Sequence, residues 1–100
     1  MSQLKMEMPH SLGSDEAAKR LKEKFSEAFA KFGSQVSDIQ ESWTDHTFCF
    51  GFTTMGMGVN GKIQVEDALV KLTAELPFAA MLFKSAIEDR IRQELGGLLN

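Results

Sequence analysis

The sequence predicts an α+β fold: a two-layer sandwich in which two helices cover a mainly antiparallel sheet, with the elements in the order β-α-β-β-β-β-α. Three observations predict it. Residues 43–77 alternate apolar and polar side chains, which is typical of strands with one face to cover. Residues 14–32 and 78–99 flank that stretch and carry apolar residues at helical spacing. A chain of 100 residues can bury one core, so we expect residues 1–100 to form a single domain.

The composition is that of an ordinary globular protein, with 43% hydrophobic and 25% charged residues. The longest apolar run, residues 77–83, is far shorter than the roughly 20 residues of a membrane-spanning helix, so we expect no transmembrane segment. The start of the sequence lacks the apolar region of a secretion signal, and the single cysteine, Cys49, cannot form an internal disulfide. We therefore expect a cytoplasmic protein. The net charge of −3 and the lack of a basic patch predict no nucleic-acid partner.

The first strand is predicted where Leu4, Met6 and Met8 alternate with charged or proline residues. Pro9 lacks a backbone N–H, so it belongs at a strand end or a sheet edge.

The first helix is predicted over residues 14–32. Ser14 is a candidate N-cap, because acidic residues follow it at the positive end of the helix dipole. Gly33 is expected to end the helix in the left-handed conformation. The apolar residues on one stripe of this helix are Ala18, Leu21, Phe25, Ala28, Phe29 and Phe32.

Four strands are predicted to follow. Residues 36–43 read as an edge strand, because Glu41 shares a face with Ile39 and Trp43. The inward residues of the other three strands alternate along the chain, and they are Phe48, Phe50 and Phe52, then Met57, Val59, Gly61, Ile63 and Val65, then Ala68, Val70, Leu72, Ala74 and Leu76.

The reversal between the second and third of these four strands has two candidate positions. Asn60-Gly61 is the strongest dipeptide signal for a hairpin turn, but the apolar alternation runs through it without a break. We therefore place the turn at the earlier glycines, residues 55–58. Glu66 and Asp67 are expected to form the last turn, so we do not interpret them as paired catalytic carboxylates.

Pro77 is predicted to mark the change from the last strand to the second helix, because proline suits the first helical position and cannot continue a ladder. The inward stripe of this helix is predicted to be Ala80, Phe83, Ile87, Ile91, Leu95 and Leu98. By analogy with helix-grip folds, a curved sheet would surround this helix.

An apolar patch stands out at the start of the second helix. Phe78 and Leu82 project onto its otherwise polar side, with Met81 at the margin. Such residues are either covered by another part of the chain or meet a partner. If the patch is exposed, it would support dimerisation, docking of a partner protein or contact with a hydrophobic particle surface.

The polar residues give weaker signals. His10, with Ser11, lies in the connection after the first strand, where a histidine can hold a loop by hydrogen bonds, bind a ligand or sense pH. Together with Trp43, these two residues are our candidates for a polar site, either ligand-binding or structural.

Asp45, His46 and Cys49 lie close in sequence, but the parity of the strand places His46 and Cys49 on opposite faces. We interpret them as a turn and a strand with a buried cysteine, and predict no catalytic residue. The spacing of histidine and cysteine predicts no metal site, and the glycines at 56, 58 and 61 do not form a phosphate-binding loop, so no cofactor is expected.

The order and spacing of several short segments resemble one bacterial family. These segments are Pro9-His10-Ser11-Leu12, Trp43 before Asp45, the Phe48-x-Phe50 strand, Gly61-Lys62-Ile63-x-Val65, Val70-x-Leu72, and Leu76-Pro77 opening the last helix. Together they are similar to the small polyhydroxyalkanoic acid system proteins, whose genes lie in regions for storage-polyester granules. The resemblance spans essentially the whole chain and implies a role around these granules. It assigns no catalytic residue to this chain. The glycine- and methionine-rich turn at residues 55–58 and the apolar first turn of the second helix depart from the family pattern.

Our leading hypothesis is a non-enzymatic accessory protein of polyhydroxyalkanoate metabolism that associates with granules in the cytoplasm. It would act by contact with a partner protein, a granule surface or a second copy of the chain. The alternative hypothesis is a domain that binds a small, lipid-like hydrophobic ligand in a cavity between the Phe48, Phe50 and Phe52 face and the second helix. An enzyme is the third choice, and it would gain support from His10 beside a carboxylate in a cleft.

Overall fold

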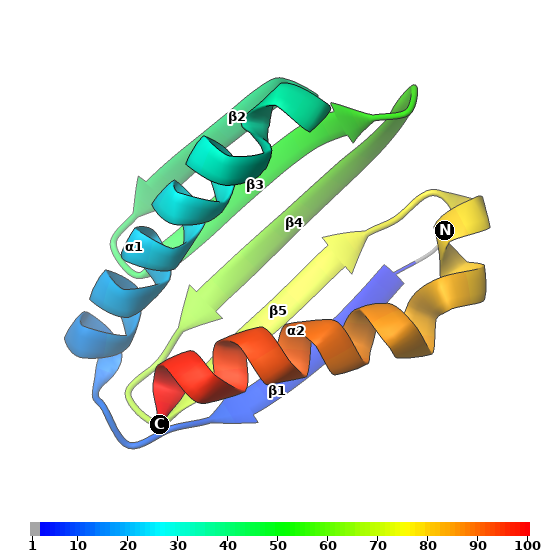
Figure 1. The fold of residues 1–100 in the computed structure, drawn as a ribbon. Helices are drawn as coiled ribbons and strands as arrows, with labels where there is room; N and C mark the ends of the chain where they lie inside the picture. The colour runs from blue at the N-terminus through cyan, green and yellow to red at the C-terminus, as the bar shows by residue number, and fades with distance from the viewer. Residues whose placement is uncertain (1–2) are drawn as a thin grey trace.

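The computed structural model describes residues 3–100, except for the side chain of Phe32, and shows one five-stranded sheet with two helices on the same face (Figure 1). The element order confirms the predicted β-α-β-β-β-β-α arrangement. The elements, including two short 3₁₀ helices labelled η, are β1 (Gln3–Pro9), α1 (Ser14–Phe32), η1 (Gly33–Gln35), β2 (Ser37–Thr44), β3 (Thr47–Thr54), β4 (Met57–Val65), β5 (Leu69–Glu75), η2 (Phe78–Phe83) and α2 (Lys84–Leu99).

The strands follow the order β1-β5-β4-β3-β2, and every neighbouring pair is antiparallel. β1 and β2 are therefore the two edges of the sheet. The register aligns one apolar residue from each strand in a row across the sheet. This row consists of Met6, Leu72, Ile63, Phe48 and Trp43. Because these side chains share one face, they form a continuous floor for the helices.

The core lies between this floor and the two helices. β2 supplies none of the fully buried residues, whereas α1 supplies Ala17, Ala18 and Leu21, and α2 supplies Leu95 and Leu99. Cys49 is exposed on the other face of β3, so the expectation of a buried cysteine is wrong. The buried residues are Leu4, Met6, Met8, Ala17, Ala18, Leu21, Phe48, Ile63, Val65, Val70, Leu72, Ala74, Leu95 and Leu99.

α1 has the predicted bounds, but the capping interaction at its start and the backbone conformation at its end differ from those predicted. The N-cap position is Gly13, and the backbone N–H of Ser14 donates a hydrogen bond of 3.2 Å to the carboxylate of Asp67. The β4–β5 turn therefore supplies the capping oxygen that we expected from Ser14 itself. Gly33 has right-handed angles, φ −60° and ψ −26°, so the helix continues into η1 instead of ending at a left-handed glycine. Phe32, the last residue of the predicted stripe, lies outside the side chains that the structure describes.

The β3–β4 hairpin turns at Met55 and Gly56, which confirms the choice of the earlier glycines. Both residues have positive φ, 53° and 75°, the pattern of a type I′ turn. Gly61 lies inside β4 opposite Phe50, where a Cβ atom would overlap the phenylalanine ring. Only a glycine therefore lets that ring lie across β4.

β2 is an irregular edge strand. The register with β3 shifts between Ser37 and Gln40, and Asp38 between them has φ 53°. Almost every residue of β2 is exposed, and Trp43 alone is half-buried, stacked on Phe48 with 4.8 Å between the ring centroids.

The change from strand to helix occurs at Pro77, as predicted, but the first six helical residues form the 3₁₀ helix η2. The N–H of Ala80 donates to the carbonyl of Pro77, a bond across three residues. A 3₁₀ helix turns about 120° per residue and an α-helix about 100°, so the predicted stripe fails at this end. Phe83, predicted to face the core, is 65% exposed.

Further along α2, the stripe holds. Ile87 and Ile91 pack against the core, and Leu95 is buried. The two glycines at 96 and 97 do not end the helix, which continues to bury Leu99.

Candidate functional site

The main candidate site is the exposed apolar segment at η2. Phe78 is 85% exposed, Leu82 is 81% exposed, and Phe83 adds a third large apolar side chain, while Met81 is half-buried. We call Phe78, Leu82 and Phe83 the apolar junction. Residues 76–83 carry no charge. The two main residues of the predicted patch therefore lie in solvent, and their role in binding stays a prediction.

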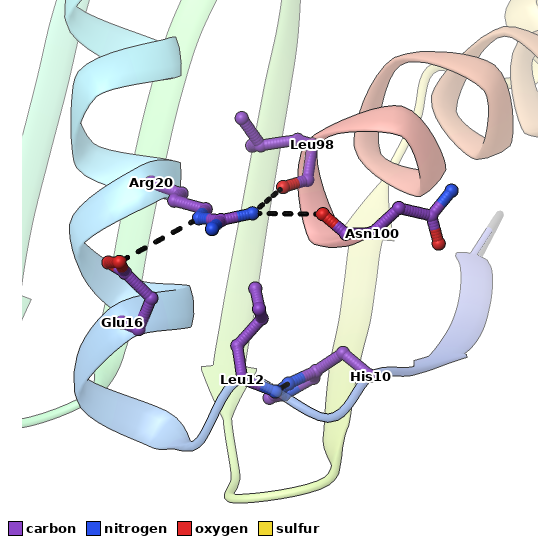
Figure 2. Close-up of polar contacts among 6 residues, drawn as sticks. All are labelled: His10, Leu12, Glu16, Arg20, Leu98 and Asn100. Atoms are coloured by element: carbon purple, nitrogen blue, oxygen red, sulfur yellow. Dashed lines mark hydrogen bonds and ion pairs between the residues drawn. The ribbon is translucent and has the colours of Figure 1, made fainter.

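The far end of α2 is held firmly to α1. Nη1 of Arg20 donates hydrogen bonds of 3.0 Å to the carbonyl of Leu98 and 3.1 Å to the carbonyl of Asn100, while Glu16 lies 4.0 Å from Nε (Figure 2). These carbonyls belong to the helix C-terminus, where backbone acceptors lack helical partners and the helix dipole favours a cation. α2 is thus anchored at its C-terminal end, and the apolar junction lies at its opposite end (Figure 1).

A groove of about 460 Å³ opens between α1 and α2 above the sheet. Its floor and walls are largely apolar, with Phe50, Ile63 and Leu72 from the sheet, Phe25 from α1, and Ile91 and Leu95 from α2. We call it the interhelical groove. The predicted cavity beneath the second helix differs from it, because Phe48 is fully buried and Phe52 is not among the lining residues. Of the three phenylalanines predicted to border the cavity, Phe50 alone lines the groove.

The rim of the groove is charged but locally neutralised. Glu94 of α2 accepts from Lys24 of α1 at 3.0 Å and from Arg90 at 3.2 Å. The hydrogen bond from Lys24 and the positive charges of Lys24 and Arg90 lower the pKa of the Glu94 carboxyl. This ion pair ties the two helices together across the groove.

His10 holds a turn. Its Nδ1 accepts a hydrogen bond of 3.1 Å from the backbone N–H of Leu12 (Figure 2), and its Nε2 lies 2.9 Å from the carbonyl of Glu66. Because Nδ1 accepts, the neutral ring carries its proton on Nε2, which donates to Glu66. Both ring nitrogens are used to join the β1–α1 connection to the β4–β5 turn.

The structure does not bring Trp43 to His10. His10 follows the edge strand β1, whereas Trp43 lies in β2 at the opposite edge, with β5, β4 and β3 between them. Trp43 instead receives Lys22 over its ring, with Nζ 4.9 Å from the ring centroid. Ser11 is exposed beside His10. The three residues predicted as one polar site therefore do not form one.

His46 has a partner that its sequence position did not indicate. Its Nε2 lies 2.6 Å from the carboxylate of Asp15 in α1, on the helix side of the sheet, while Cys49 is exposed on the opposite face. The pair borders a shallow depression with Lys19 and Lys22. Among residues 3–100, no three histidine, cysteine or acidic side chains lie close enough together to hold a metal ion.

Two exposed apolar residues were not identified as candidates by the sequence analysis. Phe83 was assigned to the core stripe, and no pattern revealed that η2 would rotate it outward. Met55, at the tip of the β3–β4 hairpin, is 90% exposed. For Met55 a signal existed, because this large apolar residue lay within the predicted turn at residues 55–58.

Comparison with known proteins shows the fold and the family. No curated protein matches the chain. A crystal structure of Ara h 8.0201, a protein with a Bet v1-like fold, is similar over 98% of this chain and 97% of that chain, with a TM-score of 0.51 and 10% sequence identity. At this identity the similarity shows the fold alone. No helix within residues 3–100 is both long and apolar enough to cross a membrane. Residues 4–99 match the family described as "Putative polyhydroxyalkanoic acid system protein", and the chain therefore belongs to the polyhydroxyalkanoic acid system family.

Proposed function

We propose that this protein is a non-enzymatic accessory protein of polyhydroxyalkanoate metabolism, located on storage granules in the cytoplasm, that binds the granule surface or a granule protein. Family membership supports a role connected with polyhydroxyalkanoate. The proposed mode of binding is supported by the apolar junction, where three large apolar side chains are exposed within six residues. Exposed clusters of this kind mark interaction sites on soluble proteins.

The energy available from the apolar junction suits reversible attachment. Burying Phe78, Leu82 and Phe83 would contribute about 5 to 9 kcal/mol from removal of apolar surface. Loss of translational and rotational freedom on association offsets about 4 kcal/mol or more of this. The net effect is a weak contact, which many copies on one granule can make independently.

A granule-fractionation experiment tests the proposal. A tagged protein is expressed in a polyester-storing bacterium, and granules are isolated before bound proteins are identified by pull-down. We expect the wild type in the granule fraction and the double variant Phe78→Ser, Leu82→Ser largely in the soluble fraction. Ile39→Ser is the matched control, because Ile39 is a partly exposed apolar residue on the edge strand β2, which β3 and β4 separate from β5. A wild-type protein absent from granules and without polyester-enzyme partners would refute the proposal.

The interhelical groove supports a second candidate function, the binding of a small hydrophobic ligand. Its volume of about 460 Å³ lies within the usual range of ligand pockets, and its floor is apolar. Ile91→Trp would fill the groove without altering the apolar junction. If the groove binds ligand, a fluorescent fatty acid will bind the wild type and the Phe78→Ser, Leu82→Ser variant alike, and will bind Ile91→Trp several-fold more weakly. Equal binding to all three proteins would exclude the groove.

The geometry of the histidines supports a non-enzymatic role. Catalysis at His10 would need a free ring nitrogen beside a carboxylate, yet both nitrogens contact backbone groups. His46 does lie beside Asp15, but Asp15 is almost fully exposed, and the residues that line the adjacent depression include no serine, threonine or cysteine. The depression therefore offers no hydroxyl or thiol that this pair could activate.

A further inference from the structure

We infer that the β3–β4 turn and the apolar junction form one uncharged insertion surface, with Met55 as its second anchor. Its partner is the bare ester-polymer surface of a storage particle. The inference rests on the proposed granule function and adds to it a new contact residue and one specific partner.

The two parts lie at the same end of the molecule. Figure 1 shows the tip of the β3–β4 hairpin and η2 projecting at the same end of the sheet, beyond the end of β5. A shallow groove of about 520 Å³ runs between them, bordered by Met57 and Gly58 on one side and by Pro77 and Phe78 on the other, and its lining includes one charged residue, Glu75. Both parts can therefore meet one surface at the same time.

The conformation of Met55 favours a role outside the fold. A type I′ turn prefers asparagine or glycine at its first central position, because φ is positive there. Met55 adopts φ 53° and leaves its side chain 90% exposed, so it makes little contact that could offset a strain of about 1 kcal/mol. Hairpin formation alone does not explain a methionine at this position, whereas insertion of a flexible apolar side chain does.

The charges at this end favour an uncharged partner. Residues 47–61 contain no charged side chain, and neither do residues 76–83. The charged residues that flank η2, Glu75 and Lys84, have opposite signs. Binding to anionic lipid headgroups requires clustered Lys or Arg residues, which these two segments lack. An ester polymer without surface charge matches them.

The exposed area argues against a second copy of the chain as the partner. Met55 and the three side chains of the apolar junction together expose about 600 Å² of apolar surface, on the basis of about 200 Å² for a large aromatic side chain. A stable protein interface buries about 800 Å² on each partner, with close shape complementarity. Two separate projections suit an extended particle surface better, because each side chain can insert without a matching pocket.

The key variant is Met55→Asn, which removes the apolar tip but restores the preferred Asn-Gly turn. Its hairpin is expected to be at least as stable as that of the wild type, so unfolding cannot account for lost binding. Purified proteins are mixed with protein-free amorphous polyhydroxybutyrate particles, and the bound fraction is measured by sedimentation. We expect Met55→Asn to bind about three- to tenfold more weakly than the wild type. Binding of the wild type should persist in 0.5 M salt, because no ion pairs are involved.

A fluorescence measurement locates the contact. In a Cys49→Ser background, an environment-sensitive dye is attached to Met55→Cys, or to Thr44→Cys as a control, because Thr44 is exposed and pairs with Thr47 at the opposite end of β3. We expect a blue shift on particle binding at position 55 and none at position 44. Vesicles of phosphatidylcholine with phosphatidylglycerol serve as a second surface, and we expect weaker binding to them than to the polymer.

The outcomes separate this inference from the proposed function. If Phe78→Ser, Leu82→Ser loses particle binding but Met55→Asn binds like the wild type and the dye at position 55 shows no shift, the inference is wrong and the proposed function stands. Tighter binding to the anionic vesicles than to the polymer, or binding abolished by salt, would overturn the choice of partner. If the wild-type protein does not bind the protein-free particles but is found on granules in cells, the inference is refuted. The partner would then be a granule protein.

Discussion

The ring of Phe50 lies across Gly61 on the neighbouring strand, in the space that a Cβ atom would occupy. This contact shapes the interhelical groove, because Phe50 is part of its floor. It also explains a glycine in the middle of β4, a position where glycine costs conformational entropy without packing in return.

We therefore predict that Gly61→Ala destabilises the protein by about 1 to 3 kcal/mol, because Phe50 must leave its position or β4 must shift. Urea unfolding followed by circular dichroism measures the change. Gly58→Ala is the matched control in the same strand, since a Cβ there would meet nothing within 4 Å. Equal free energies of unfolding for the two variants would contradict the proposed overlap.

Removal of the Arg20 side chain is predicted to loosen the C-terminal end of α2. Arg20→Ala deletes two charge-assisted hydrogen bonds to backbone carbonyls, at a cost of about 1 to 2 kcal/mol. Hydrogen exchange should accelerate at the last turn of α2 more than in β5. Arg92→Ala removes an exposed side chain that pairs with Asp89 on the same helix, and it should change neither the free energy of unfolding nor the exchange rates by much. If hydrogen exchange at the last turn of α2 is as slow in Arg20→Ala as in the wild type, the carbonyls of Leu98 and Asn100 do not depend on Arg20.

Acid is predicted to weaken the link between the β4–β5 turn and α1. Hydrogen bonds from the backbone N–H and then the hydroxyl of Ser14 hold the pKa of Asp67 below its ordinary value. A lowered pKa in the folded state means that the carboxylate stabilises the fold above its ordinary pKa, and that this stabilisation is lost as the pH falls through the lowered value. The stability difference between the wild type and Asp67→Asn should thus shrink below about pH 4.

An NMR titration of the Asp67 carboxyl group checks the cause of this shift. In Ser14→Ala the midpoint should move upward but stay below the ordinary value, because the backbone N–H remains. A midpoint that does not move on this substitution would exclude the hydroxyl as a donor.

His10 is predicted to be a structural residue. His10→Phe keeps the size of the ring but leaves the N–H of Leu12 and the carbonyl of Glu66 without their side-chain partner, at a cost of about 1 to 2 kcal/mol. His46→Phe should cost less, because its contact with the exposed Asp15 lies at the surface. Thermal unfolding distinguishes the two variants, and the reverse order of stabilities would argue against this role for His10.

The sequence predicted the parts of the fold that depend on regular spacing. The alternation of Ile63 and Val65 placed the strands and their inward faces, and the helical spacing of Leu21 and Phe25 placed α1, because both patterns follow directly from backbone geometry. The same reasoning failed at Phe83, where a 3₁₀ segment changed the angle per residue, and at Gly33, where helical angles continued beyond the expected end.

The candidate site was only partly predictable for a related reason. Phe78 and Leu82 could be found, because they interrupt the polar face of one helix. The contact between His46 and Asp15, and the capping of Ser14 by Asp67, join residues that are distant in sequence, and no local pattern encodes such pairs. The interhelical groove likewise depends on the spacing of two helices, which is set only when the whole core packs.

The irregularity in β2 affects whether neighbouring copies of the chain can pair edge to edge. An open strand edge invites pairing with the edge of a neighbouring molecule, and this would chain molecules into fibres wherever they are concentrated. The shifted register between Ser37 and Gln40 and the left-handed Asp38 disrupt the straight row of N–H and C=O groups that such pairing needs. Crowded copies of the chain are therefore expected not to join edge to edge through β2.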